Sequence, residues 1–260
     1  MGLLDSPAAQ APSLTSTHIR GSAVTRPAGG TLVPPTGGQV CALFAADIAE
    51  FTRGDRDDDI RLHLHEELYR ILEQAFDASG IPWNACFTED RGDGALVVIP
   101  PNIGAKAIID PLPERLRTLI RRHNHVSRDA ARIQLRVAAH MGPVDHDGHG
   151  FIGTDVNFLF RMLDARPLRA ALVGTGADLA YITSDYVYSN IVCRHPSMIN
   201  PDDFRLIKFQ VKRTRTQARI YLPGALRSLA RRSQRTLARQ YSDSPFLVQE
   251  AFRHSQTLGM

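Results

Sequence analysis

Two apolar runs joined by a Gly-Asp-Gly turn constrain the fold of this chain more than any other stretch. The first run begins at Phe87, the turn is Gly92-Asp93-Gly94, and the second run ends at Ile99. Apolar runs on both sides of such a turn are typical of a β-hairpin, which we predict over 81–99. Asp93 then lies at the tip of the hairpin. Because aspartate often serves only as a turn former, Asp93 indicates a site only if it has a partner.

A second strand supplies that partner. Val40–Asp47 is almost continuously apolar and ends in an aspartate, as is typical of a central strand buried on both faces. If it lies beside the hairpin, Asp47 and Asp93 meet at one end of the sheet. Two such carboxylates can bind Mg²⁺ ions that carry nucleotide phosphates. The alternative is a strand-end carboxylate and an unrelated turn former.

Helices and strands follow one another along the rest of the domain. Apolar residues at helical spacing predict helices over 56–78 and 112–125, and alternating residues predict a strand over 132–139. Residues 140–144 are predicted to turn the chain, and Thr154 or Asp155 to cap a helix that runs through Leu163. Later elements are predicted as a strand at 180–183, a helix at 184–192 and a hairpin of 204–211 with 218–222. This order predicts an α+β fold over 39–223, with an antiparallel sheet flanked by helices.

The two ends of the chain differ from this domain in composition. Residues 1–38 are rich in Pro, Gly, Ala, Ser and Thr, and predict a disordered leader. Residues 224–260 predict a basic helical extension, in which Arg227, Arg231, Arg235 and Arg239 lie on one face. We expect this helix to dock on the domain or its dimer mate, or to contact a regulatory protein. A membrane or nucleic-acid contact is the weaker alternative, since no nucleic-acid motif accompanies the helix.

Composition also excludes several classes of protein. The three cysteines are scattered without a CxxC pair, which argues against a disulfide framework or a zinc knuckle. No stretch approaches the roughly 20 consecutive apolar residues of a transmembrane segment. The N-terminus lacks the continuous apolar region of a secretion signal. We therefore expect a cytoplasmic protein.

Four short motifs, in a fixed order, carry the functional prediction. They are Asp47-Ile48-Ala49-Glu50-Phe51-Thr52, Gly92-Asp93, Leu135-Arg136 continuing to His140-Met141-Gly142-Pro143-Val144, and Val156-Asn157 continuing to Arg161-Met162. Together they resemble the catalytic domain of class III nucleotidyl cyclases, the adenylate and guanylate cyclase family. In the first motif Glu50 stands where the family pattern has glycine. A looser basic motif at 211–215 follows in the expected place.

The resemblance implies a ferredoxin-like, palm-type sheet that binds two Mg²⁺ or Mn²⁺ ions at Asp47, Ile48 and Asp93. It implies conversion of a nucleoside triphosphate into a 3′,5′-cyclic nucleotide and pyrophosphate. Asn157 and Arg161 are four residues apart on one predicted helix and so share a face. The resemblance implies that Asn157 orients the ribose and that Arg161 stabilises charge on the reacting phosphate. It also implies a homodimer with composite sites, in which one protomer supplies the metal carboxylates and its partner supplies this pair.

Further residues are implied in substrate binding. Lys212, Arg213 and Arg215 could hold the β- and γ-phosphates. Glu89 stands where adenylate cyclases carry lysine and guanylate cyclases carry glutamate, and Gly150 stands at the second base-reading position. These two residues favour GTP or a pyrimidine nucleotide over ATP. The alternative is a catalytically silent, nucleotide-binding regulator that acts through partner contacts, which Glu50, Gly150 and the loose basic motif favour.

Overall fold

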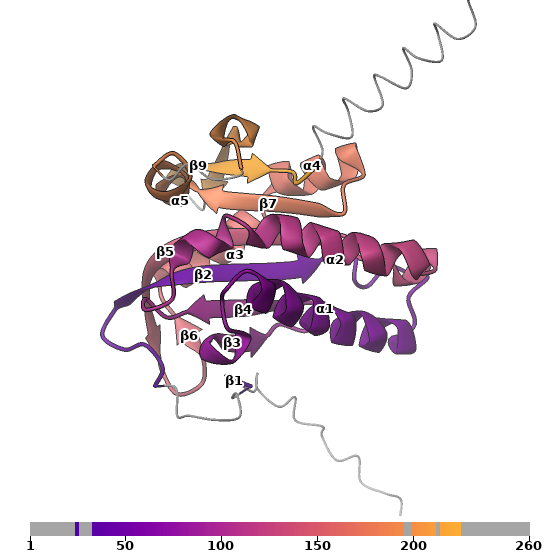
Figure 1. Cartoon of the computed structure of the whole chain (residues 1–260), viewed down its shortest axis with the longest axis horizontal. Helices are drawn as coiled ribbons and strands as arrows, with labels where there is room; N and C mark the ends of the chain where they lie inside the picture. Colours follow the sequence, from indigo (N-terminus) through magenta and orange to yellow (C-terminus); the bar gives the residue numbers. More distant parts are fainter. Residues whose placement is uncertain (1–23, 26–32, 195–198, 212–213, 225–260) are drawn as a thin grey trace, which may run out of the picture.

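A mixed sheet with helices on both faces forms the body of the protein (Figure 1). The computed structural model describes residues 24–25, 33–194, 199–211 and 214–224. Along the sheet the strands follow the order β1-β3-β4-β2-β5-β7-β9-β8, with β6 paired to β5. Among these strands only β5 and β7 pair in parallel. The strands are β1 (Val24–Thr25), β2 (Gln39–Ile48), β3 (Phe87–Asp90), β4 (Gly94–Ile99), β5 (Leu135–His146), β6 (Phe151–Ile152), β7 (Leu179–Ser184), β8 (Arg205–Val211) and β9 (Thr214–Tyr221).

The sheet separates two apolar layers. Side chains of β2 at 42, 44, 46 and 48 pack with α1 and α2, which lie across the same face of the sheet in Figure 1. Those at 41, 43 and 45 pack with α3 and α4 on the other face. Successive side chains of a strand point to opposite faces, so a strand covered on both sides must be apolar throughout. The α-helices are α1 (Asp58–Ala78), α2 (Leu112–Val126), α3 (Thr154–Leu163), α4 (Arg166–Thr175) and α5 (Asp185–Val187). The predicted α+β fold with a helix-flanked sheet is confirmed, and its strand pairs are antiparallel as predicted except for β5 with β7.

Local signals in the sequence define the ends of α1. The Asp57 side chain accepts a hydrogen bond from the Ile60 main-chain N–H at 2.9 Å, and Asp58 and Asp59 occupy the first turn. Both features stabilise a helix N-terminus, where main-chain N–H groups lack partners. At the other end Gly80 adopts a φ of 77°, a left-handed conformation that suits glycine. The helix therefore begins two residues after the predicted start and ends where the sequence predicts.

Two local predictions were wrong, and one helix was missed. The turn predicted at His140–Val144 lies inside β5, because this segment continues to pair with β2 as far as Gln39 opposite Val144. Helix α4 was not predicted, since a proline in its first turn and a glycine near its end obscured a short amphipathic pattern. Helix α3 begins after Gly153, which occupies the N-cap position without a side-chain hydrogen bond.

The N-terminal segment contributes to the sheet edge. Within the predicted disordered leader, Val24–Thr25 form β1 and pair with Glu89 and Thr88 of β3. Composition alone did not predict this strand. The predicted basic helix at 224–260 falls outside the described residues except for Gly224. No helix within the described ranges has both the length and the apolar character that a membrane span needs.

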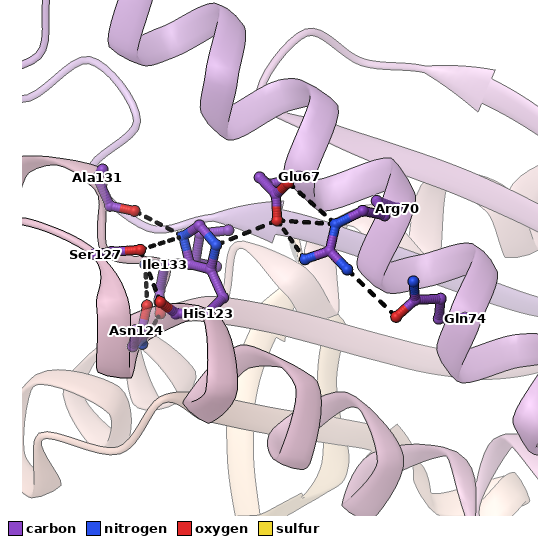
Figure 2. A network of polar contacts seen from close by, with 8 residues as sticks. All are labelled: Glu67, Arg70, Gln74, His123, Asn124, Ser127, Ala131 and Ile133. Carbon is purple, nitrogen blue, oxygen red and sulfur yellow. Dashed lines mark hydrogen bonds and ion pairs between the residues drawn. The ribbon is translucent and has the colours of Figure 1, made fainter.

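A polar network joins the two helices of the first layer (Figure 2). The buried His123 ring of α2 lies 3.2 Å from a Glu67 carboxylate oxygen of α1 and 2.8 Å from the Ala131 carbonyl oxygen. Arg70 also donates to Glu67, and these contacts lower the pKa of the Glu67 carboxyl, chiefly through Arg70. Because a carbonyl only accepts, the His123 nitrogen facing Ala131 carries a proton. The network ties α1 to α2 and to the segment before β5, and it contains none of the candidate site residues.

Candidate active site

The sheet brings the two predicted metal carboxylates to the same end. Asp47 lies opposite Gly94 in the β2–β4 pairing, and the Ile48 N–H donates to the Asp93 carbonyl oxygen at 2.9 Å. A Cβ on Gly94 would lie 2.1 Å from the Ala46 carbonyl oxygen. Only glycine therefore allows the hairpin to approach β2 this closely. The Gly-Asp-Gly turn thus positions Asp93 beside Asp47 through backbone contacts.

Arg136 of β5 is the immediate partner of Asp47. Its Nε and Nη2 atoms donate to the two Asp47 carboxylate oxygens at 2.7 and 2.8 Å. Burial raises the pKa of Asp47 to about 6, against the opposing effect of Arg136 and with further upward contributions from Asp93 and Asp164. Sequence reasoning gave Arg136 no role. The sequence feature that could have indicated this role is an arginine within a buried strand, at the position that pairs with Asp47.

The oxygen atoms gathered here fit Mg²⁺ or Mn²⁺. Mg²⁺ commonly binds one or two protein carboxylates and completes its shell with substrate phosphates and water. Asp47, Asp93 and the Ile48 carbonyl are the oxygen donors that the sequence predicts, and each Asp47 oxygen keeps a lone pair beside its bond to Arg136. No three His, Cys, Asp or Glu side chains gather into a metal cage within the described ranges. The chain itself thus offers two carboxylates and one main-chain carbonyl as candidate oxygen donors.

A buried arginine holds the loop that follows Asp47. Arg56 is 4% exposed and donates to main-chain carbonyl oxygens of Glu50, Ala130 and Arg132 at 3.0, 3.0 and 2.8 Å. A longer contact of 3.5 Å reaches Ala49. Main-chain carbonyls that no helix or strand pairs need such donors. Arg56 thus links the end of β2 to the segment that leads into β5.

Glu50, which replaces the glycine of the family pattern, adopts a φ of 54°. This left-handed conformation is unfavourable for residues that carry a Cβ. We expect Glu50→Gly to raise the free energy of unfolding by about 0.5–1 kcal/mol. Urea denaturation would measure the change. Glu50→Ala is the control, because it removes the same exposed carboxylate but keeps the Cβ. Equal stability of the two variants would contradict the backbone explanation.

Helix α3 presents the predicted ribose and phosphate residues. Asn157 is exposed and Arg161 is half-buried, and neither side chain forms a hydrogen bond or ion pair with the residues that the structure describes. Neither contacts Asp47 or Asp93 through such a bond. Within one protomer, the carboxylates at the sheet end and the polar pair on α3 are therefore not joined by a hydrogen bond or ion pair.

A buried histidine fixes the start of α3. His140 of β5 lies 2.8 Å from Ser184 Oγ through Nδ1 and 2.8 Å from Asp155 Oδ1 through Nε2, and Phe158 packs edge-on against its ring. A Cβ on Gly142 would lie 2.4 Å from Asp155 Cγ, so glycine leaves room for this carboxylate. Burial lowers the pKa of His140, and Asp155 opposes the shift. The network sets α3 against β5 and the end of β7.

The lowered pKa of His140 predicts a loss of stability in acid. The unfolded chain takes up the proton near pH 6.5, whereas the folded state does so only at lower pH. The stability contributed by neutral His140 is therefore complete above pH 6.5 and falls as the pH drops below it, with a limiting slope of about 1.4 kcal/mol per pH unit. Urea denaturation of wild type and His140→Asn between pH 5 and 8 would measure this. Parallel profiles for the two proteins would contradict the prediction.

The two predicted base-reading positions contact each other. Glu89 Oε1 accepts a hydrogen bond from the Phe151 N–H, and Oε2 accepts one from Arg91 at 2.5 Å. A Cβ on Gly150 would lie 2.8 Å from Glu89 Oε1. Gly150 therefore lets the main chain before α3 reach the Glu89 carboxylate. The predicted phosphate-binding residues are only partly described. Arg215 lies in β9 opposite Gln210, and Lys212 and Arg213 lie outside the described ranges.

Solved structures with the same arrangement of elements are nucleotide cyclases. The adenylate/guanylate cyclase/hydrolase from Silicibacter pomeroyi superposes with a TM-score of 0.52 and 19% identity, over 71% of this chain and 97% of that one. The guanylyl cyclase Cya2 superposes with a TM-score of 0.50 and 12% identity, over 70% of this chain and 90% of that one. This chain has a cyclase-domain fold. No protein-family model and no curated protein matches the sequence.

Proposed function

We propose that this protein is a nucleotidyl cyclase that converts a nucleoside triphosphate into a 3′,5′-cyclic nucleotide and pyrophosphate. The observation that carries the proposal is the placement of Asp47 and Asp93 side by side at the end of a cyclase-type sheet. A fold alone does not define an activity, whereas paired carboxylates at this position provide a binding site for a metal-bound triphosphate.

The reaction needs charge stabilisation and positioning more than covalent chemistry by the protein. Two Mg²⁺ or Mn²⁺ ions at Asp47, Ile48 and Asp93 would activate the ribose 3′-hydroxyl and neutralise the triphosphate. The 3′-oxygen attacks the α-phosphorus and loses its proton to water, while the bond to the pyrophosphate oxygen breaks. In this proposal Asn157 orients the ribose, and the Arg161 guanidinium balances charge on the α-phosphate. Arg136, Lys212, Arg213 and Arg215 are cations suited to the remaining phosphates.

The proposed active unit is a homodimer with composite sites. Asn157 and Arg161 have no polar partner within the described part of their own protomer and are accessible on α3. Asp47 and Asp93 lie at the end of β2 and in the hairpin turn, and neither is bonded to this pair within the described residues. A second protomer that brings its α3 toward these carboxylates would complete one site and, by symmetry, a second.

Turnover of the four common nucleotides tests the proposal. The purified protein is incubated with ATP, GTP, CTP or UTP and Mn²⁺, and products are separated by chromatography. We expect a cyclic nucleotide from at least one substrate and none from an Asp93→Ala variant with unchanged circular dichroism. Absence of product from all four substrates, with folded wild-type protein, would refute the proposed activity.

A nucleotide-binding regulator without turnover is the second candidate. The observation that favours it is the bidentate Arg136–Asp47 pair, which engages both oxygens of one predicted metal ligand. This candidate predicts that a nucleotide raises the melting temperature while no product forms. Product formation from any of the four nucleotides would exclude it.

A further inference from the structure

The carboxylate that the family pattern assigns to base reading is already engaged. The Glu89 side chain is only 3% exposed, and each of its oxygens accepts a hydrogen bond, one from the Phe151 N–H and one from Arg91. The close approach at Gly150 keeps the main-chain donor in place. A carboxylate held in this way has little surface left to offer to a base.

Arg91 occupies the position between this carboxylate and α3. Its side chain is 37% exposed, and its Cζ atom lies 4.8 Å from the ring centroid of Phe160, a cation–π contact. Phe160 follows Asn157 by three residues on α3, so the two occupy neighbouring positions along one side of the helix. The guanidinium is thus fixed beside the proposed ribose contact. One of its N–H groups donates to Glu89, and within the described residues the others donate to no partner.

We propose that Arg91, and not Glu89, reads the nucleotide base, with Glu89 as the positioning residue that holds Arg91; this inference rests on the proposed cyclase function. The forked guanidinium group of arginine only donates hydrogen bonds, and it pairs best with two adjacent acceptor atoms. Guanine offers O6 and N7 as such a pair, and arginine bound to these atoms is the commonest specific base contact. Cytosine offers O2 and N3. Adenine places its amino donor beside N1 and N7, and its remaining acceptor, N3, has no acceptor on an adjacent group. Uracil places an N–H between its two carbonyl groups.

The inference therefore names the substrate class as a triphosphate whose base presents two adjacent acceptors. GTP and CTP are the two candidates, and the assay distinguishes between them. A preference for CTP or UTP also separates the two possible readers, because a Glu89 acceptor would select bases that donate a hydrogen bond. If GTP is preferred, the effect of Arg91→Leu decides between them. Reading by Glu89 predicts GTP and UTP as substrates, since both carry a ring N–H donor.

The experiment compares kcat/KM for the four nucleotides with Mn²⁺ in wild type, Arg91→Leu and Arg61→Leu. We expect wild type to prefer GTP or CTP, and Arg91→Leu to lower kcat/KM for the preferred substrate by about 10- to 100-fold while changing ATP and UTP by less than about 3-fold. Arg61 is the matched control, because it is 34% exposed and also pairs with a carboxylate, that of Asp58. Its variant should leave all four values unchanged.

A second variant and a binding measurement test Arg91 if the first variant does not fold or the wild type is inactive. If Arg91→Leu does not fold, Arg91→Lys keeps the charge but loses the fork, and it should reduce the preference in the same direction. If wild type turns over no nucleotide, the cyclase proposal fails, and calorimetric binding of the same four nucleotides with Mg²⁺ then tests the base reader alone. The assignment to Arg91 would be overturned if wild type preferred ATP or UTP, or if Arg91→Leu lost the same fraction of kcat/KM for all four nucleotides. In the binding measurement, equal binding of all four nucleotides or binding of none would overturn it.

Discussion

Mixing Asp47→Ala protein with Arg161→Ala protein is expected to restore about a quarter of the wild-type turnover, since half of the randomly formed dimers carry one intact site of two. Each variant alone should lose at least about 10²- to 10³-fold in kcat, because each homodimer lacks one charged group at both sites. In the mixed dimer, the intact carboxylates of one protomer meet the intact Arg161 of its partner. Product formation after co-refolding of the two proteins would measure the effect.

The matched control mixes Asp47→Ala protein with Asp93→Ala protein. Both substitutions lie on the carboxylate side, so every mixed dimer has two damaged metal sites. No turnover should return. Restoration in this control, or its absence in the first mixture when both proteins are folded and dimeric, would contradict the composite site.

Arg56→Leu is expected to lower the free energy of unfolding by about 3 kcal/mol, the largest stability loss that we predict for a single polar side chain here. The substitution leaves the carbonyl oxygens of Glu50, Ala130 and Arg132 without their buried donor. Three hydrogen bonds from a buried, charged guanidinium are lost, and each contributes about 1 kcal/mol. Urea denaturation monitored by circular dichroism would measure the loss.

The neighbouring Arg53 provides the control for this prediction. Its side chain is 37% exposed and pairs with Asp55, which is itself half exposed. Exposed ion pairs contribute little, so Arg53→Leu should cost less than about 1 kcal/mol. If the two variants lost equal stability, the burial of Arg56 would not explain its role.

The sequence predicted the elements whose signals are local. The apolar run ending at Asp47, the turn around Asp93 and the spacing of α1 each follow from neighbours in the chain, and their combination indicated the cyclase-like sheet. The side chains that complete the site could not be predicted in the same way. Arg136 meets Asp47 across 89 positions of sequence, and Glu89 meets the Phe151 N–H across 62.

Long-range pairing also explains the errors in the prediction of the fold. Residues 140–144 contain glycine and proline and indicate a turn on local grounds, yet their pairing with β2 keeps them in β5. Helix α4 is short, and packing against the second apolar layer stabilises it more than its own composition does. In both cases, contacts with distant parts of the chain outweigh local preference.

The Arg136–Asp47 pair affects the stability of the folded protein when no metal ion is bound. Many small metal-binding domains cannot fold until the ion arrives, because their ligands repel one another or lose solvation without it. Here an internal guanidinium already compensates a buried carboxylate at the candidate site. This carboxylate therefore needs no cation for its compensation, so that under the proposed function a shortage of metal would lower the activity of the protein more than its stability.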